Sequence, residues 1–114
     1  MKETSSIKEN REFRRIYAKG KSCVSPYLVV YCRKNRREHN RLGITVGVKL
    51  GHAVVRNRVR RRLREIFRLN QQKLLKGYDI IIVARVRSVG AEYRELEQAF
   101  LHSCGKLSLL EEKK

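Results

Sequence analysis

The chain has 114 residues, of which 41% are hydrophobic, so one globular domain with a single small core is expected and a disordered chain is not. Lysine and arginine number 28 against 11 acidic residues, which gives a net charge of +17 and a pI near 10.6. Such a charge indicates a polyanionic partner, by default a nucleic acid. No apolar run is long enough to span a membrane and the N-terminus lacks the apolar stretch of a secretory signal, so we expect no membrane partner and a cytoplasmic location.

The first segment, 1–9, is polar and is expected to be flexible within a single domain that spans 1–114. A short amphipathic helix should follow and end near Gly20. Its N-cap is either Asn10 or Ser6, because Ser6 with Glu9 forms a competing capping box. The helix is predicted from apolar residues at i, i+3 and i+4, namely Phe13, Ile16 and Tyr17.

Extended structure is predicted from residue 21 onward. In the run 26–32, β-branched and aromatic residues occupy both odd and even positions, which suits a strand covered on both faces or partly lined by a ligand. A shorter strand is possible at 21–24. After a charged connection at 33–41, the segment 42–48 alternates apolar residues with Gly43, Thr45 and Gly47. This alternation predicts a strand with one apolar face and one face small enough for another element to approach closely.

The most basic segment, 56–68, contains seven arginines in thirteen residues. An apolar stripe at helical spacing runs through it, which predicts a helix that ends between Lys73 and Lys76: Val55, Val59, Leu63, Ile66 and Phe67. One flank of this helix carries Asn57, Arg60, Arg61, Arg64 and Arg68, and the other carries Arg58 and Arg62. Arg56 projects near the apolar stripe and is therefore placed in or near the first turn, where free backbone N–H groups could also meet a phosphate. A solvated surface helix is the alternative, but such helices usually intersperse acids, and Glu65 is the only acid here.

Two elements complete the chain. The apolar run 78–85 predicts a central strand, and apolar residues at helical spacing predict a last helix over 93–107, with acids near its N-terminal end. The order is helix, two or three strands, helix, strand and helix, which predicts a single α+β domain with a mixed sheet of about four strands and three helices.

The residue inventory argues against several kinds of site. The three cysteines, Cys23, Cys32 and Cys104, show no CxxC spacing, so reduced thiols packed as small hydrophobic groups are expected, with no disulfide partner and no metal site. Asp79 is the only aspartate, whereas a protein nuclease of the two-metal kind needs several converging carboxylates. We therefore expect no catalytic residue in this polypeptide.

The run from Gly51 to Glu65, which reads GHAVVRNRVRRRLRE, resembles the signature of the bacterial ribonuclease P protein component. The similarity extends through Asn10-x-x-Phe13-x-x-x-Tyr17-x-x-Gly20, through GITV at 43–46 and through YDIIIVAR at 78–85, and it covers roughly residues 8–105. The resemblance implies a fold similar to domain 2 of a small-subunit ribosomal protein and to domain IV of elongation factor G, with the basic helix in a left-handed β-α-β crossover. It implies a protein subunit of a ribonucleoprotein endonuclease that removes the 5′ leader from precursor tRNA. In that enzyme the RNA subunit, with its bound Mg²⁺ as cofactor, performs the catalysis.

The same resemblance implies two binding surfaces. The basic helix would dock on the RNA subunit through Arg56, Asn57, Arg58, Arg60, Arg61, Arg62, Arg64 and Arg68. A cleft between the first helix and the sheet would hold the single-stranded leader of precursor tRNA through Phe13, Tyr17, Tyr31, Lys49 and Arg85, although Phe13 and Tyr17 could instead be core residues. Many relatives carry phenylalanine in place of Tyr17 and two adjacent lysines in place of Val48 and Lys49, so this cleft has one cation fewer.

Three other functions remain open. A structural ribosomal or architectural RNA-binding protein could use the same helix without any cleavage. A sequence-specific DNA-binding module is less compatible, because arginines on both flanks of the helix suit phosphates from several directions better than one row of base edges. A free-standing protein nuclease is the least compatible, for want of carboxylates.

Overall fold

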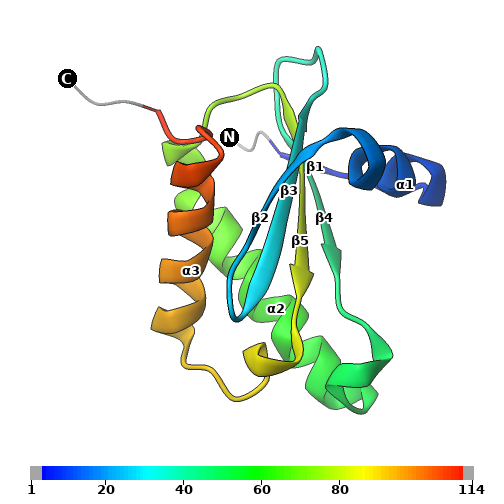
Figure 1. Cartoon of the computed structure of the whole chain (residues 1–114), viewed down its shortest axis with the longest axis vertical. Helices are drawn as coiled ribbons and strands as arrows, with labels where there is room; N and C mark the ends of the chain where they lie inside the picture. The colour runs from blue at the N-terminus through cyan, green and yellow to red at the C-terminus, as the bar shows by residue number, and fades with distance from the viewer. Residues whose placement is uncertain (1–3, 112–114) are drawn as a thin grey trace.

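The computed structural model describes residues 4–111, which form one sheet with helices on both of its faces (Figure 1). Within this range there are three α-helices and five strands, and the strands form a single sheet. The helices are α1 (Asn10–Lys19), α2 (Ala53–Asn70) and α3 (Tyr93–Lys106), and the strands are β1 (Ser5–Ser6), β2 (Lys21–Val24), β3 (Leu28–Lys34), β4 (Arg41–Thr45) and β5 (Tyr78–Ala84). No described helix is long and apolar enough to cross a membrane.

The strand order in the sheet is β1-β4-β5-β3-β2. The sheet is mixed, as predicted: β4 runs parallel to both β1 and β5, whereas β3 is antiparallel to β5 and β2. The basic helix α2 forms the β-α-β connection between the adjacent parallel strands β4 and β5. The most apolar run of the sequence is thus central, because β5 is hydrogen-bonded on both sides.

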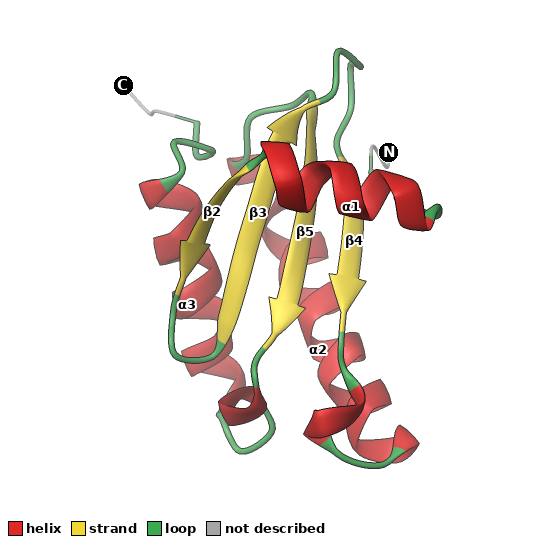
Figure 2. Cartoon of the chain, turned by 45° about the vertical axis from the view of Figure 1, so that its right-hand side comes forward, coloured by secondary structure: helices red, strands yellow, loops and turns green. Residues whose placement is uncertain are grey.

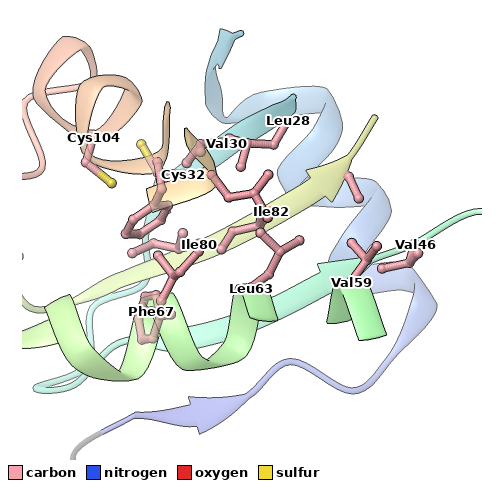
Figure 3. Close-up of a cluster of buried hydrophobic side chains, with 14 of the residues drawn as sticks. Leu28, Val30, Cys32, Val46, Val59, Leu63, Phe67, Ile80, Ile82 and Cys104 are labelled. Carbon is pink, nitrogen blue, oxygen red and sulfur yellow. The ribbon is translucent and has the colours of Figure 1, made fainter. Parts of the chain in front are cut away.

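One face of the sheet is covered by α2 and α3, and the main core lies between these two helices and the sheet (Figures 2 and 3). The predicted apolar stripe of α2 supplies Val59, Leu63, Ile66 and Phe67, all buried. Alternate residues of β3 and β5 point into this core, and Phe67 meets Phe100 of α3 at 6.1 Å between ring centres. The amphipathic pattern of the sequence therefore fixes which side of α2 remains exposed.

On the opposite face, α1 is the one helix among the described residues, and it crosses the strands (Figure 2). Here the small face of β4 has the predicted effect, since a Cβ atom on Gly43 would lie 2.7 Å from two ring carbons of Phe13. Arg41 then ties α1 to the sheet, because its guanidinium binds Glu12 at 3.0 Å and Asp79 at 2.7 Å. A helix that is held at these points leaves the rest of this face open.

Three expectations about the elements were wrong in detail. A fifth strand exists because the backbone N–H groups of Ser5 and Ile7 donate hydrogen bonds to the carbonyl oxygens of Asn40 and Leu42, so residues 5–7 are paired with the β4 segment and Ile7 is buried. The N-cap of α1 is Glu9, without a side-chain capping bond, in place of Asn10 or Ser6. Finally, α2 ends at Asn70 and a short 3-10 turn follows, so the helix is shorter than predicted.

Candidate RNA-binding surfaces

The outward side of α2 presents four arginines together with one asparagine, which we call the arginine face: Asn57, Arg60, Arg61, Arg64 and Arg68. The buried stripe on the opposite side of the helix fixes this orientation. Arg56 lies in the first turn, as predicted, and its Nε donates to the carbonyl oxygen of Gly51 at 3.1 Å. The start of α2 has no side-chain cap, so free backbone N–H groups and arginines are presented together.

Two contacts within the arginine face control the directions of its side chains. The Nη1 atom of Arg60 donates to the Oδ1 atom of Asn57 at 2.8 Å, which confines one guanidinium without neutralising it. Arg68 pairs with Glu65 at 3.1 Å, but both side chains are largely exposed, so this pair is weak and screened. Two arginines of this face, Arg60 and Arg68, are therefore oriented, and the face retains most of its positive charge.

Arg62 behaves differently from the other arginines of α2. It is half-buried, and its Nη1 atom donates to the carbonyl oxygen of Ala91 at 3.0 Å, on the segment that leads into α3. The prediction that grouped it with the RNA-facing arginines missed this contact, because helical periodicity places Arg62 on a flank but does not reveal a neighbouring carbonyl. Arg62 fastens α2 to the rest of the fold, whereas Arg58 on the same flank is exposed.

On the other face of the sheet, three aromatic rings form a cluster, which we call the aromatic surface: Phe13, Tyr17 and Tyr31. The ring of Tyr17 lies 6.3 Å from that of Phe13 and 4.8 Å from that of Tyr31, with an edge-on geometry in the second pair. The hydroxyl of Tyr17 is 2.9 Å from the Oγ1 atom of Thr45, which anchors the ring over β4. Phe13 is partly a core residue, since it packs on Gly43 and against the Ile16 cluster.

Tyr17 is the ring of this cluster that is best placed for a ligand. It is 36% exposed, and together with Phe13, Arg14 and Thr45 it lines a hollow of about 290 Å³. An exposed aromatic ring beside a cation can stack with a nucleobase while the cation meets its phosphate.

Lys49 and Arg85 line an adjacent apolar hollow of about 420 Å³, which we call the cationic hollow. Thr45 borders both hollows, so the structure brings the five predicted cleft residues to one face of the molecule. Arg85 is oriented by a hydrogen bond from its Nη1 atom to the carbonyl oxygen of Ser25 at 2.8 Å. Arg85 lies one residue beyond β5, at an odd-numbered position like Ile81 and Val83, whose side chains face α1.

Sequence reasoning missed three residues that border these hollows. Arg14 neighbours Phe13 on α1, Thr45 belongs to the small face of β4, and Arg87 lies two residues beyond Arg85. Only the alternation around Thr45 carried a usable signal, because it predicted that an element would approach there. The positions of Arg14 and Arg87 depend on how α1 crosses the sheet and how the chain turns after β5.

Two carboxylates, those of Asp79 and Glu12, hold the side chain of Arg41 near the start of α1. Burial raises the pKa of Asp79, but hydrogen bonds from Arg41 at 2.7 Å and Asn35 at 2.9 Å outweigh it and hold that pKa below its usual value. The hydrogen bond from Arg41 likewise lowers the pKa of Glu12. Within residues 4–111, no group of three or more His, Cys, Asp or Glu side chains is placed to hold a metal ion.

Comparison with known proteins points to one family. A family model described as Ribonuclease P matches residues 1–108. A ribonuclease P protein component from Alkaliphilus oremlandii is 44% identical over 110 residues, covering 96% of both chains. Another from Clostridium botulinum is 42% identical over 110 residues, covering 96% of this chain and 98% of the relative.

Solved structures show the same fold. The ribonuclease P protein of Staphylococcus aureus superposes with a TM-score of 0.85 at 33% identity, covering 97% of this chain and all of that one (100%). The protein from Thermotoga maritima gives a TM-score of 0.79 at 34% identity, covering 86% of this chain and 93% of that one. With sequence, motif and fold in agreement over nearly the whole length, the chain belongs to the family of ribonuclease P protein components.

Proposed function

We propose that this protein is the subunit of ribonuclease P that binds the RNA subunit through α2 and the 5′ leader of precursor tRNA over the aromatic surface. The observation that supports this division is that α1 and α2, which carry the two surfaces, lie on opposite faces of one sheet (Figure 2). The arginine face lies outside α2, whereas the aromatic surface lies beside α1. One molecule can thus contact two RNAs without competition between them.

The arginine face suits a folded RNA. Guanidinium groups bind phosphate oxygens with paired hydrogen bonds, and a row of them along 18 residues of helix can follow a sugar–phosphate backbone. Such contacts read shape and charge rather than base sequence. The proposed role of Asn57 is to hold Arg60 in position for this contact.

The aromatic surface suits a single strand of variable sequence. Stacking on Tyr17 and Tyr31 is available to any base, and Lys49 and Arg85 in the neighbouring hollow can meet phosphates. Leaders differ between tRNAs, so tolerance of sequence is what this substrate requires. The protein would hold the leader near the catalytic RNA and raise its local concentration there.

We assign the Mg²⁺ of the reaction to the RNA subunit. The described residues do not fit a magnesium site of their own, because the carboxylates of Asp79 and Glu12 are engaged by Arg41. Bound Mg²⁺ would supply an activated water and charge stabilisation in the RNA. The part of this protein is to bind and orient the substrate.

The direct test is cleavage of a leader-bearing precursor tRNA at low Mg²⁺ by a bacterial ribonuclease P RNA, with and without the protein. Cleavage that depends on both components, with none from the protein alone, is expected. Tight RNA binding without rescue would favour an architectural RNA-binding protein. Cleavage by the protein alone would contradict the assignment of catalysis to the RNA.

The leader site has its own test in Tyr17→Ala, with Tyr17→Phe as the matched control that keeps the ring. Loss of one stacked base at about 1–3 kcal/mol should weaken binding of precursor tRNA to the holoenzyme by roughly 5- to 150-fold. Mature tRNA, which lacks a leader, should bind as before. Equal losses for both tRNAs would show that Tyr17 acts only in packing.

A further inference from the structure

A further hollow lies between the N-terminal strand and the last turns of α2, at the edge of the arginine face. Its volume is about 520 Å³, which falls within the roughly 300–1,000 Å³ of sites that hold small molecules. The residues that matter for its chemistry come from β1, β4, α2 and the turn after α2: Ser6, Leu42, Arg64, Phe67, Arg68 and Gln71. Three segments far apart in the sequence therefore build one site.

The walls of this hollow combine an apolar surface with a polar edge. Leu42 and Phe67 supply the apolar part. Ser6 is paired with Leu42 in the β1–β4 register, so its hydroxyl lies on the α2 side of the sheet. The Oε1 atom of Gln71 accepts a hydrogen bond from Thr4 at 2.6 Å, which holds the amide in place while its nitrogen remains a donor.

The rim of the hollow is cationic. Arg64 and Arg68 line it and are also members of the arginine face, so the hollow is continuous with the surface proposed to dock on RNA. The exposed contact between Arg68 and Glu65 offsets little of that charge. An apolar wall, a hydrogen-bonding edge and two guanidinium groups are together the complement of a base with its phosphate.

We propose that this hollow binds one unpaired nucleotide of the RNA subunit, with its base against Leu42 and Phe67 and its phosphate on Arg64 and Arg68. Ser6 and Gln71 would meet the edge of the base. A paired RNA helix would offer the arginines its phosphates but would leave the hollow empty, whereas an unstacked base can enter it, and unstacked bases are what proteins read in RNA. The inference rests on the proposed function, because the RNA subunit is the source of the nucleotide.

The test compares Gln71→Ala with Gln72→Ala, a neighbour in the same turn that does not line the hollow. Assembly with ribonuclease P RNA is measured at several salt concentrations. Gln71→Ala should weaken assembly by roughly 10-fold, the size of one nucleobase contact, while the salt dependence stays unchanged because the arginines remain. Gln72→Ala should assemble like the unmodified protein.

Chemical probing of the RNA in the same complexes identifies the nucleotide. Dimethyl sulfate and a carbodiimide, which together report on all four base edges, should show one unpaired base that the unmodified protein protects and the Gln71→Ala protein leaves reactive. Because Gln71→Ala also removes the contact with Thr4, a second variant, Ser6→Phe, fills the hollow from the other side and should give the same 10-fold loss and the same exposed base.

Two results would overturn the inference. One is assembly by Gln71→Ala and Ser6→Phe as tight as that of Gln72→Ala, and the other is an RNA in which no base changes its reactivity. Either result leaves the proposed function intact if the unmodified protein still assembles with a steep salt dependence. Absence of salt-dependent assembly by the unmodified protein would instead contradict the proposed function itself.

Discussion

Replacing Arg60, Arg64 and Arg68 together by glutamine tests the docking role of α2 most directly. All three belong to the arginine face and none is buried, so the substitutions remove charge without opening the core. If each guanidinium meets one phosphate, each contributes roughly 0.7–0.9 to the slope of log affinity against log salt. The variant should therefore show a slope shallower by roughly 2–3 units.

The corresponding change in affinity is large enough to measure. Raising the salt from 50 to 200 mM weakens RNA binding by both proteins. With a slope shallower by roughly 2.4 units, the variant should lose about 30-fold less affinity over this range than the unmodified protein loses. The assay is filter binding or fluorescence anisotropy with labelled ribonuclease P RNA over this range. The matched control replaces Arg11, Arg94 and Lys106 by glutamine, which removes the same net charge from exposed positions on α1 and α3. An unchanged slope in the α2 variant, or an equal change in the control, would refute the docking role.

Three further predictions concern the fold that carries these surfaces. Gly43→Ala should destabilise the protein by about 1–3 kcal/mol in chemical denaturation, because the new methyl group would lie 2.7 Å from the Phe13 ring; no change would mean that α1 moves freely over the sheet. The pKa of Asp79 is lower in the folded protein than its unfolded value near 3.8, so its ion pair stabilises the protein above that pH, and the stabilisation is lost as the pH falls through the folded-state pKa. The free energy of unfolding, measured from pH 6 to pH 2, should therefore depend less on pH in Asp79→Asn than in the unmodified protein. Identical pH dependence in both proteins would contradict this role. Burial raises the pKa of Cys104 to about 12, so at pH 8 this thiol should resist a disulfide reagent under native conditions while the half-buried Cys23 reacts, and equal rates would show that the core opens readily.

The sequence predicted the long periodic elements and failed on short ones. In α2, five apolar residues at helical spacing determine both the helix and its buried side, because burial of that stripe outweighs the repulsion among its arginines. The two-residue strand β1 had no pattern to detect, since Ser5 and Ser6 are polar and their pairing depends on carbonyl groups of a segment more than thirty residues away. Only Ile7, an isolated apolar residue that the fold buries, hinted that this segment is ordered.

The site residues, too, divide into those that a periodic pattern predicts and those that depend on contacts between distant segments. Phe13 and Tyr17 were predictable as a pair, because helical spacing places them on one side of α1. The facing of Tyr31 and Arg85 required the register of β3 against β5, which puts Tyr31 opposite Ile81 on the α1 side. The end of β4 was equally undetermined: alternation continues to Val48, yet the strand ends at Thr45 and Val48 is 76% exposed.

The distribution of the acids explains how so basic a chain both folds and keeps its charge available. Glu12 and Asp79 hold Arg41 and thereby α1, Glu97 accepts a hydrogen bond from the buried Asn70 at the end of α2, and Glu92 and Glu95 cap α3. Each of these carboxylates accepts hydrogen bonds from a partly buried side chain or from a backbone N–H group at a helix start that would otherwise lack a partner. Few are therefore left to neutralise the arginine face, where Glu65 makes the one ion pair that the described residues show. A polyanion that approaches α2 thus meets guanidinium groups with little internal competition, and the energy that would otherwise be needed to break ion pairs remains available for binding.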